Sequence, residues 1–278
     1  MKHVAPYFFA AALVVSLAGC DSISLPGLGE GEELDQFRDK SVEALYNNAL
    51  DNLEAGWHQN AAKLFDELER QHPYSAWAMK AQLMAAYSNY QQGAYDEAII
   101  ALDRYIELHP GHRDVGYAHY LKGLSYYEQI SDVGRDQKMT QLALVTLRDI
   151  VKRFPDTPFA RDARIKLELT QDNLAGKEME IGRYYMQRRE YLAAINRFKF
   201  VIEKFQTTKH VAEALHRVTE SYLALGVTDE AQMATAVLGY NYPGSSWYED
   251  SYTLLEQNSL TPQRKESSWL SWLWTWTN

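Results

Sequence analysis

The sequence predicts an all-α fold, a solenoid of about five helix-turn-helix repeats behind an N-terminal targeting segment. The first supporting observation is an alanine followed twelve residues later by a proline, a spacing shared by Ala61/Pro73, Ala98/Pro110, Ala143/Pro155 and Ala231/Pro243. Ala194 begins a fifth copy, in which Gln206 replaces the proline. The second observation is a glycine five residues before the alanine in three copies, at Gly56, Gly93 and Gly226. The third is the residue four positions after the alanine: Phe65, Leu102, Leu147, Phe198 and Thr235.

Each of these signals has a structural meaning in a helical hairpin. A small residue lets the second helix cross close to the first, and the large apolar residue one turn later fills the space beside it. Proline ends the helix because its ring and its missing N–H cannot continue the hydrogen-bond ladder. Glycine supplies the positive φ that closes the turn. Self-similarity at roughly 34 to 40 residues is typical of stacked hairpins, and the pattern resembles the tetratricopeptide (TPR) family.

From these signals we expect repeats near residues 42–75, 79–112, 116–157, 175–208 and 212–245, within a solenoid over 42–255. A long helix over about 158–189 should supply the first helix of the fourth repeat, since Thr157 suits an N-cap and Pro158 suits the first helical position. A polar insertion at 131–136 belongs in the loop of the third hairpin. A partial helix from Trp247 to Leu255 would cap the last apolar face, and residues 256–278 form a tryptophan-rich tail.

The first nineteen residues have the features of a lipoprotein signal peptide, a basic start and a short apolar core. The core ends in Leu17-Ala18-Gly19-Cys20, which resembles a bacterial lipobox, so we expect lipid on Cys20 and a flexible tether over 20–41. Cys20 is the only cysteine and cannot form an intramolecular disulfide. The alternative is an ordinary secretory signal with an incidental cysteine. Asp21 leaves the choice of membrane open, because in some bacteria an aspartate after the lipidated cysteine favours the inner membrane.

Composition and motifs argue against catalysis and against nucleic-acid binding. The formal net charge of −9 disfavours a nucleic-acid partner. The sequence contains no His-Glu-x-x-His, Gly-x-Ser-x-Gly or Walker motif. We therefore expect a protein that is not an enzyme, with no catalytic residues, no metal site and no cofactor apart from the covalent lipid on Cys20.

Tyrosines recur on the predicted first helices, at positions that do not pack on the neighbouring hairpin. First helices line the concave face of TPR arrays, and tyrosine offers flat apolar area with a polar hydroxyl. We predict that this face binds extended substrate peptides through Tyr46, Tyr87, Tyr90, Tyr117, Tyr120 and Tyr127. The alternative is that many of these tyrosines belong to the core.

Charge is uneven along the chain. Acidic residues outnumber basic ones over 30–70, whereas basic residues predominate over 175–217. We interpret the basic stretch as an interface for an acidic partner surface, formed by Arg183, Arg188, Arg189, Arg197, Lys199 and Lys204. The alternative is a solvated helix face.

The tail ends in a cluster of tryptophans that is too short to span a bilayer. Tryptophan favours the membrane–water interface, and an uncovered cluster would aggregate. We predict contact with the membrane or with a partner through Trp269, Trp272, Trp274 and Trp276. The alternative is that the tail packs on its own solenoid.

The lipobox, the five repeats, the enlarged third repeat and the long helix together resemble the BamD family, lipoproteins of the machinery that folds β-barrels into the outer membrane. The resemblance covers about Ser41 to Leu255, with its most specific stretches at Ala61–Pro73, Ala98–Pro110 and Tyr117–Leu124. The chain departs from the family pattern at Gln206, at Asp21 and in its tail.

The resemblance implies a lipid-anchored, non-enzymatic scaffold on the periplasmic face of the outer membrane. The amino-terminal repeats would meet unfolded outer-membrane proteins. The carboxy-terminal repeats would bind the barrel-forming subunit BamA, alongside other subunits of the assembly complex. The alternative function is a TPR lipoprotein scaffold of a cell-wall or division complex.

Overall fold

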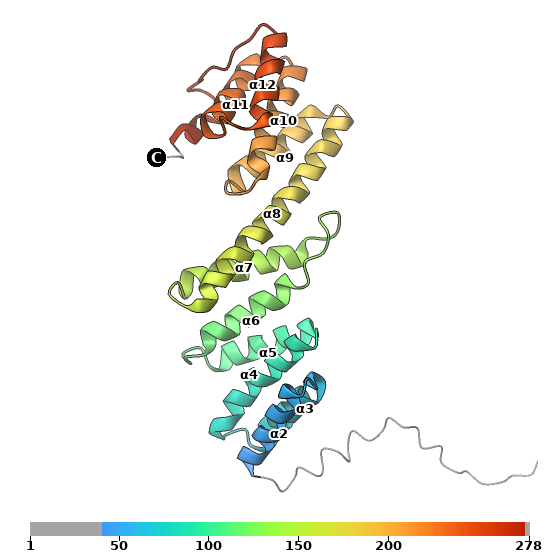
Figure 1. Ribbon diagram of the computed structural model, residues 1–278, viewed down its shortest axis with the longest axis vertical. Helices are drawn as coiled ribbons and strands as arrows, with labels where there is room; N and C mark the ends of the chain where they lie inside the picture. The colour runs from blue at the N-terminus through green and yellow to red at the C-terminus, as the bar shows by residue number, and fades with distance from the viewer. Residues whose placement is uncertain (1–40, 276–278) are drawn as a thin grey trace, which may run out of the picture. The chain divides into compact units, whose positions relative to one another are not determined.

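A computed structural model describes residues 41–275, and this range is helical throughout, with no strand (Figure 1). The all-α fold of stacked hairpins is therefore confirmed for this part of the chain. The predictions for the signal peptide, Cys20, the tether and Trp276 fall outside the described residues. The elements are α2 (Val42–Glu54), α3 (His58–Gln71), α4 (Ala76–Gln91), α5 (Tyr95–Leu108), α6 (Val115–Tyr127), α7 (Lys138–Arg153), α8 (Pro158–Gln187), α9 (Tyr191–Lys204), α10 (His210–Ala224), α11 (Thr228–Asn241), α12 (Ser246–Gln257) and the short 3-10 helix η1 (Ser271–Thr275).

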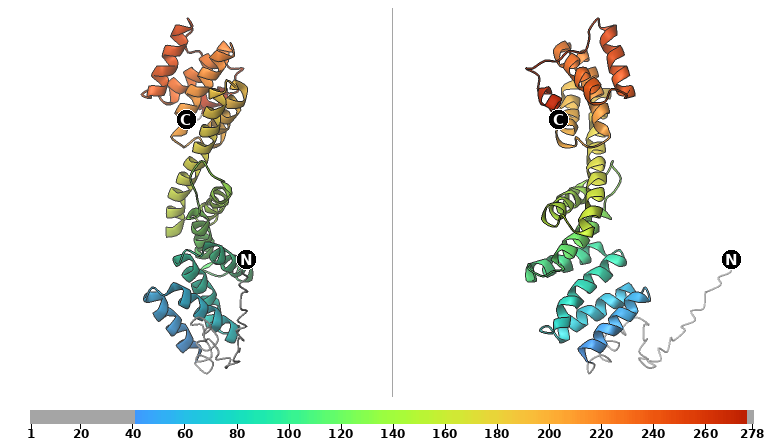
Figure 2. Two further views of the ribbon diagram at one scale, coloured as in Figure 1. Left: turned by 90° about the vertical axis from the view of Figure 1, so that its right-hand side faces the viewer. Right: turned by 60° about the vertical axis from the view of Figure 1, so that its left-hand side comes forward.

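Successive helices pair as hairpins, and the hairpins stack in chain order. The first helices α2, α4, α6, α8, α10 and α12 each contact the next member of the series. The long helix α8 packs on α6 and α7 at one end and on α9 and α10 at the other, so it links the two groups of hairpins (Figures 1 and 2). The insertion at 131–136 lies in the loop between α6 and α7. Each group of hairpins is thus positioned through α8.

The alanine of every repeat is buried in the face through which the second helix packs. Ala61, Ala98, Ala143, Ala194 and Ala231 are all 0% exposed, as are the five residues one turn later. All five second helices end with one geometry, at φ near −130° and ψ near 50°. The copy without proline reaches the same end; there the Gln206 side chain donates to the Glu203 carbonyl at 3.3 Å, and Thr208 Oγ1 donates to the Phe205 carbonyl at 2.7 Å.

In four of the five hairpins, the turn between the paired helices contains a left-handed residue. Gly56 and Gly93 have φ of 80° and Gly226 has φ of 74°. In the fourth hairpin the same position is occupied by Arg189, with φ of 61°. A residue with a Cβ adopts this conformation at a cost of roughly 1–2 kcal/mol, so Arg189 departs from the pattern that the other turns follow.

Helix α8 begins as its sequence predicts and is continuous across Gly176. The Thr157 side chain accepts a hydrogen bond from the Ala160 amide at 3.3 Å, and Pro158 occupies the first helical position. Near the other end, Gly182 permits close packing of α9, since a Cβ there would lie 2.4 Å from Cε1 of Phe198. The fourth hairpin depends on this glycine for its tight crossing.

The tail folds back on its own solenoid up to η1. Leu270 and Leu273 are fully buried in the core formed by α8 to α11. Trp269 Nε1 donates to the Tyr222 hydroxyl at 3.1 Å. Trp269 therefore packs on its own solenoid, which was the alternative interpretation of the tail. Trp272 is 37% exposed, and its predicted membrane or partner contact stays a prediction. The side chains of Trp274 and Trp276 fall outside what the structure describes.

The turn at Arg189 leads to a stability prediction. Replacing Arg189 by glycine should raise the free energy of unfolding by about 1 kcal/mol, because the left-handed backbone is then unstrained. The converse change, Gly226→Ala, should lower it by a similar amount, since a Cβ there meets no atom within 4 Å and the cost is conformational alone. Urea denaturation of the purified protein measures both changes. A loss of stability in Arg189→Gly would contradict the strain at this turn.

Candidate binding surfaces

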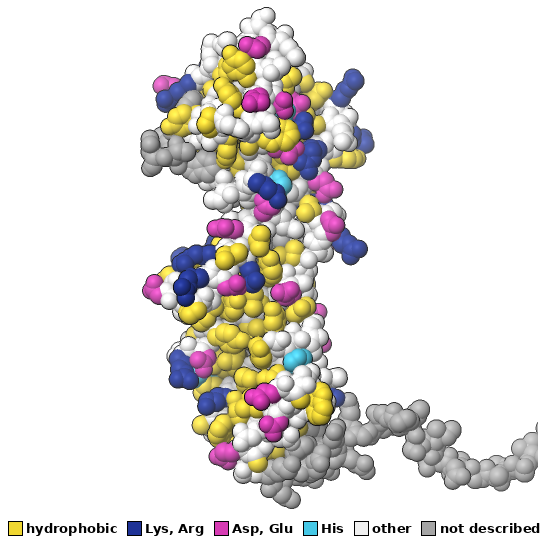
Figure 3. Space-filling view, viewed as in Figure 1, with side chains coloured by type: hydrophobic (Ala, Val, Ile, Leu, Met, Phe, Trp, Pro, Cys, Tyr) yellow, Lys and Arg dark blue, Asp and Glu magenta, His cyan; other side chains and the backbone are white. Residues whose placement is uncertain are grey.

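Four of the six predicted tyrosines form one aromatic cluster, which we call the tyrosine cluster: Tyr87 and Tyr90 on α4, and Tyr117 and Tyr120 on α6. The rings of Tyr117 and Tyr120 lie 6.3 Å apart. All four pack partly buried against the core between these helices, so each presents only part of its ring to solvent. These tyrosines therefore belong partly to the core and partly to the surface that was predicted to bind peptides. Figure 3 shows hydrophobic side chains gathered over the part of the molecule that contains α4 to α7.

The hydroxyl groups of this cluster are held by polar neighbours. The Tyr120 hydroxyl donates to Asp162 Oδ2 at 2.6 Å, and the Tyr90 hydroxyl donates to Glu128 Oε1 at 3.5 Å. Burial raises the pKa of Tyr90 and of Tyr117 to about 12, so both hydroxyls stay neutral at physiological pH. The result is a set of fixed rings with neutral polar edges, which suits apolar and aromatic peptide side chains.

Tyr46 and Tyr127 lie beside this cluster. The ring of Tyr46 packs 4.8 Å from Trp77 and 5.5 Å from Phe65, within the first two hairpins. The ring of Tyr127 lies beneath Lys166 Nζ at 5.0 Å, and Tyr127 packs against the same core cluster of the third hairpin as Tyr120. Tyr127 is therefore linked to the tyrosine cluster through Tyr120, whereas Tyr46 packs in the first two hairpins.

Sequence reasoning missed the residues that α8 contributes to the tyrosine cluster. Phe159 stacks on Tyr120 with ring centroids 5.8 Å apart, and Asp162 accepts the Tyr120 hydrogen bond. Both residues come from the start of α8, about forty residues later in the chain. No local signal identifies such a pair, because the contact arises only when α8 packs on α6.

Four of the six predicted basic residues form ion pairs: three lie on helices α8 and α9, and the fourth, Arg188, lies in the turn between those helices. Arg183 bonds Glu213 at 3.0 Å and joins α8 to α10. Arg197 bonds Glu178 at 3.1 Å and joins α9 to α8. Lys199 lies 3.7 Å from Glu203 and 4.5 Å from the centroid of the Trp269 ring, beneath the tail. These three side chains hold the hairpins and the tail together.

Arg188 and the remaining two basic residues are divided between the two ends of α9. Arg188 and Arg189 lie in the turn before the helix, whereas Lys204 is its last residue, roughly 20 Å away. The Arg188 guanidinium lies over the Tyr184 ring, donates to the Tyr184 hydroxyl at 3.2 Å and forms an ion pair with Glu190 at 3.0 Å. The predicted basic interface is thus two separate regions.

Two exposed apolar residues flank the arginines of this turn. Tyr184 is 54% exposed and Leu192 is 68% exposed. We call Tyr184, Arg188, Arg189 and Leu192 the fourth-hairpin tip. Sequence reasoning missed Leu192, although a signal was present: the equivalent residue in every other copy is polar, namely Gln59, Asp96, Gln141 and Asp229.

A serine, a histidine and a glutamate lie together where α12 docks on α10. The Ser251 hydroxyl and His216 Nδ1 share a hydrogen bond of 2.8 Å, and His216 Nε2 lies 3.5 Å from Glu220 Oε2. These distances resemble a hydrolase triad, but Ser251 is 0% exposed, so no substrate carbonyl can reach its hydroxyl in this arrangement. The group attaches α12 to the preceding hairpin.

No element of the described residues 41–275 is both long enough and apolar enough to cross a bilayer as a helix.

A family model described as "YfiO: Outer membrane lipoprotein" matches residues 38–238. A curated relative from Caulobacter vibrioides, named outer membrane protein assembly factor BamD, is 48% identical over 254 residues, which are 91% of this chain and 81% of the relative. The chain belongs to the BamD family of outer membrane lipoproteins.

Other members of the BamD family carry the same name. The protein from Rickettsia prowazekii is 46% identical over 77% of this chain and 86% of its own length. The protein from Neisseria meningitidis serogroup A is 35% identical over 75% of this chain and 82% of its own. The family resemblance seen in the sequence is confirmed, and the expected role in outer membrane protein assembly agrees with these names. Among solved structures, MamA aligns over 74% of the chain with 18% identity and a TM-score of 0.35, a likeness that carries no argument.

The buried His216 leads to a prediction of pH dependence. Burial lowers the pKa of its imidazole, an effect that Glu220 partly opposes. As the pH falls below about 6.5, the unfolded chain therefore binds more protons than the folded chain. The free energy of unfolding consequently decreases on acidification. In His216→Gln the free energy of unfolding should fall less steeply between about pH 6.5 and pH 5.

The matched control is Ser251→Ala, which removes the hydrogen bond but keeps the titrating imidazole. This variant should be less stable by about 1 kcal/mol and should keep the steeper pH dependence. Unfolding curves at several pH values measure both quantities. An unchanged slope in His216→Gln would show that this imidazole does not carry the dependence.

Proposed function

We propose that the chain is a lipid-anchored scaffold that acts in β-barrel assembly on the periplasmic face of the outer membrane. The observation that carries this proposal is the family match over 38–238, which includes the helices of all five hairpins apart from the last residues of α11. In this proposal the lipid on Cys20 supplies membrane attachment, and the hairpins supply binding surfaces. The protein acts by holding other polypeptides rather than by chemistry on them.

The fourth-hairpin tip is the proposed contact for the barrel-forming subunit, a protein of the BamA kind. Arginine and tyrosine are enriched at the centres of protein interfaces, where an aromatic ring and a guanidinium fork bury area and bond acidic groups. The tip presents both residue types next to an exposed leucine. The strained backbone at Arg189 supports the same assignment, because strain of this kind persists where function requires it.

The tyrosine cluster is the proposed contact for unfolded outer-membrane proteins. Its rings are held in place by the core beneath them, so little side-chain entropy is lost when a peptide binds. Asp162 and Glu128 accept hydrogen bonds at its edge and can also attract basic residues of a substrate. Extended segments rich in aromatic residues match this combination.

A pull-down of the full-length lipoprotein in mild detergent, followed by mass spectrometry, tests the scaffold proposal. We expect a large β-barrel protein with periplasmic domains to be recovered. The double variant Arg188→Glu and Leu192→Glu should recover at least tenfold less of it, because both a charge and an apolar contact are lost.

The matched control is Lys204→Glu, which makes the same change of charge as Arg188→Glu alone, at the other end of α9. It should leave the recovery unchanged. Absence of a barrel protein from the wild-type sample would refute the assembly role. Equal losses in the control and in the tip variant would refute the proposed interface alone.

A further inference from the structure

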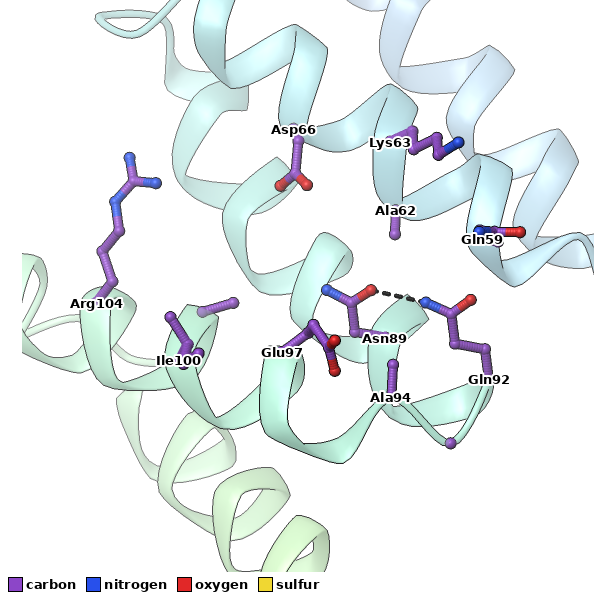
Figure 4. Close-up of a pocket in the computed structure, with 12 residues that line it drawn as sticks. Gln59, Ala62, Lys63, Asp66, Asn89, Gln92, Ala94, Glu97, Ile100 and Arg104 are labelled. Carbon is purple, nitrogen blue, oxygen red and sulfur yellow. Dashed lines mark hydrogen bonds between the residues drawn. The ribbon is translucent and has the colours of Figure 1, made fainter. Parts of the chain in front are cut away.

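A hollow lies between α3 and α5, the second helices of the first two hairpins. Its volume is about 700 Å³, which is in the range of peptide and ligand sites. We call it the α3–α5 groove. Figure 4 shows Asp66, Asn89 and Glu97 extending into the space between the helices. The lining of the groove includes Ala62, Asp66, Asn89, Glu97, Ile100 and Ala101.

The groove exists because its floor is made of small residues. Ala62 follows the crossing alanine of the first repeat, and the other repeats carry Ile99, Leu144, Ile195 and Gln232 at the same position. Ala94 and Ala101 add little volume from α5. Because these side chains are small, the groove reaches close to the helix backbones, and longer polar side chains form its walls.

The equivalent groove at the other end of the solenoid is already occupied by a segment of the same chain. Adding 133 to a residue number in the first two hairpins gives its counterpart in the last two, as Ala61 and Ala194 or Ala98 and Ala231 show. On this numbering the α3–α5 groove corresponds to the groove between α9 and α11. That second groove holds the tail, which turns back from α12 and ends beside α11 (Figure 1).

The tail binds its groove through both backbone and side chains. Gln232 Nε2 donates to the Thr261 carbonyl at 2.7 Å, and the Gln263 amide donates to the Gln232 carbonyl at 3.3 Å. Ser268 Oγ donates to Glu230 Oε2 at 2.6 Å. Trp269 follows and lies against Lys199 and Tyr222, and two buried leucines come next in the segment. The groove between α9 and α11 thus accommodates a short polypeptide segment that contains a turn.

Four residues that contact the tail have counterparts in the lining of the α3–α5 groove. Glu230 corresponds to Glu97, Met233 to Ile100, Tyr222 to Asn89 and Lys199 to Asp66. In the first two pairs both residues are of the same type, acidic or apolar. In the last two pairs the type differs: Lys199 and Tyr222, which contact Trp269, correspond to a carboxylate and an amide. A tryptophan in that place loses its cation–π partner, whereas a lysine or arginine gains an acid.

The Asp66 carboxylate is available for such a partner. Among the described residues, none donates a hydrogen bond to it, and Arg104 is held by Glu69. Partial burial raises the Asp66 pKa to about 6, the charge of Glu69 adds to the rise, and Arg104 opposes it. A cation placed in the groove would relieve this repulsion and stabilise the ionised carboxylate.

We propose that the α3–α5 groove binds a short segment of a partner polypeptide in which a lysine or arginine directly precedes an apolar residue. The backbone of the segment lies along the edge of α5, its basic side chain reaches Asp66, and its apolar residue fills the hollow over Ala62 and Ala101. The chain's own tail from a second copy does not match, because it places Trp269 where a cation is required. This proposal does not depend on the assembly role.

Two fluorescent peptides and the full-length lipidated protein in detergent test the proposal by fluorescence anisotropy. The first peptide has the sequence of residues 267–273, and the second is identical except for the change Trp269→Lys. The lysine peptide should bind at least tenfold more tightly than the tail peptide. The protein variant Asp66→Lys, which introduces the charge of Lys199, should reverse this preference.

The control variant is Asp51→Lys, an equal change of charge on the exposed surface of α2, and it should keep the wild-type preference. Helical circular dichroism should be the same in both variants, because neither substituted side chain belongs to the buried core. Three results would overturn the proposal: no binding of the lysine peptide up to about 1 mM, equal binding of the two peptides, or no effect of Asp66→Lys. Equal binding would point to a second copy of the chain as the occupant instead.

Discussion

Every hairpin of the described residues packs its second helix through an alanine that is fully buried in all five copies. This packing determines which face of the helix is buried and which residues remain on the outside. Because each hairpin packs mainly on its neighbours, the stability of the solenoid is a sum of local terms. A binding surface on one hairpin can therefore differ from its neighbours without loss of the fold.

The departures from the repeat are the most informative positions in the chain. Arg189 takes a backbone conformation that glycine takes elsewhere, and Leu192 is exposed where the other copies are polar. Ala62 leaves a hollow where three other copies carry a large aliphatic residue. Each departure breaks a local rule without a gain inside the hairpin, which is the pattern expected at functional sites. The fourth-hairpin tip and the α3–α5 groove each contain such a departure.

The sequence was sufficient for the hairpins and insufficient for their surfaces. The alanine spacing and the terminating prolines are local signals, and they predict helix pairs, the continuous α8 and the loop insertion. Contacts such as Tyr120 with Asp162, or Lys199 with Trp269, join residues that are distant in the chain. The basic residues show the same limit: periodicity placed Arg183 and Arg197 on helices, but only the packing of α8 on α9 and α10 shows that they are paired. The tail is not part of a repeat, so no sequence pattern predicts where it packs.

The two proposed surfaces of the assembly role lie on different hairpins, so they should contact different proteins. Photo-crosslinking in living cells tests this directly, with a photoreactive residue placed at Leu192 in one strain and at Tyr87 in another. The residue at 192 should trap a single barrel-forming subunit, whereas the residue at 87 should trap a range of newly made outer-membrane proteins. Capture of the same set of proteins from both positions, or of no envelope protein from either, would contradict the account.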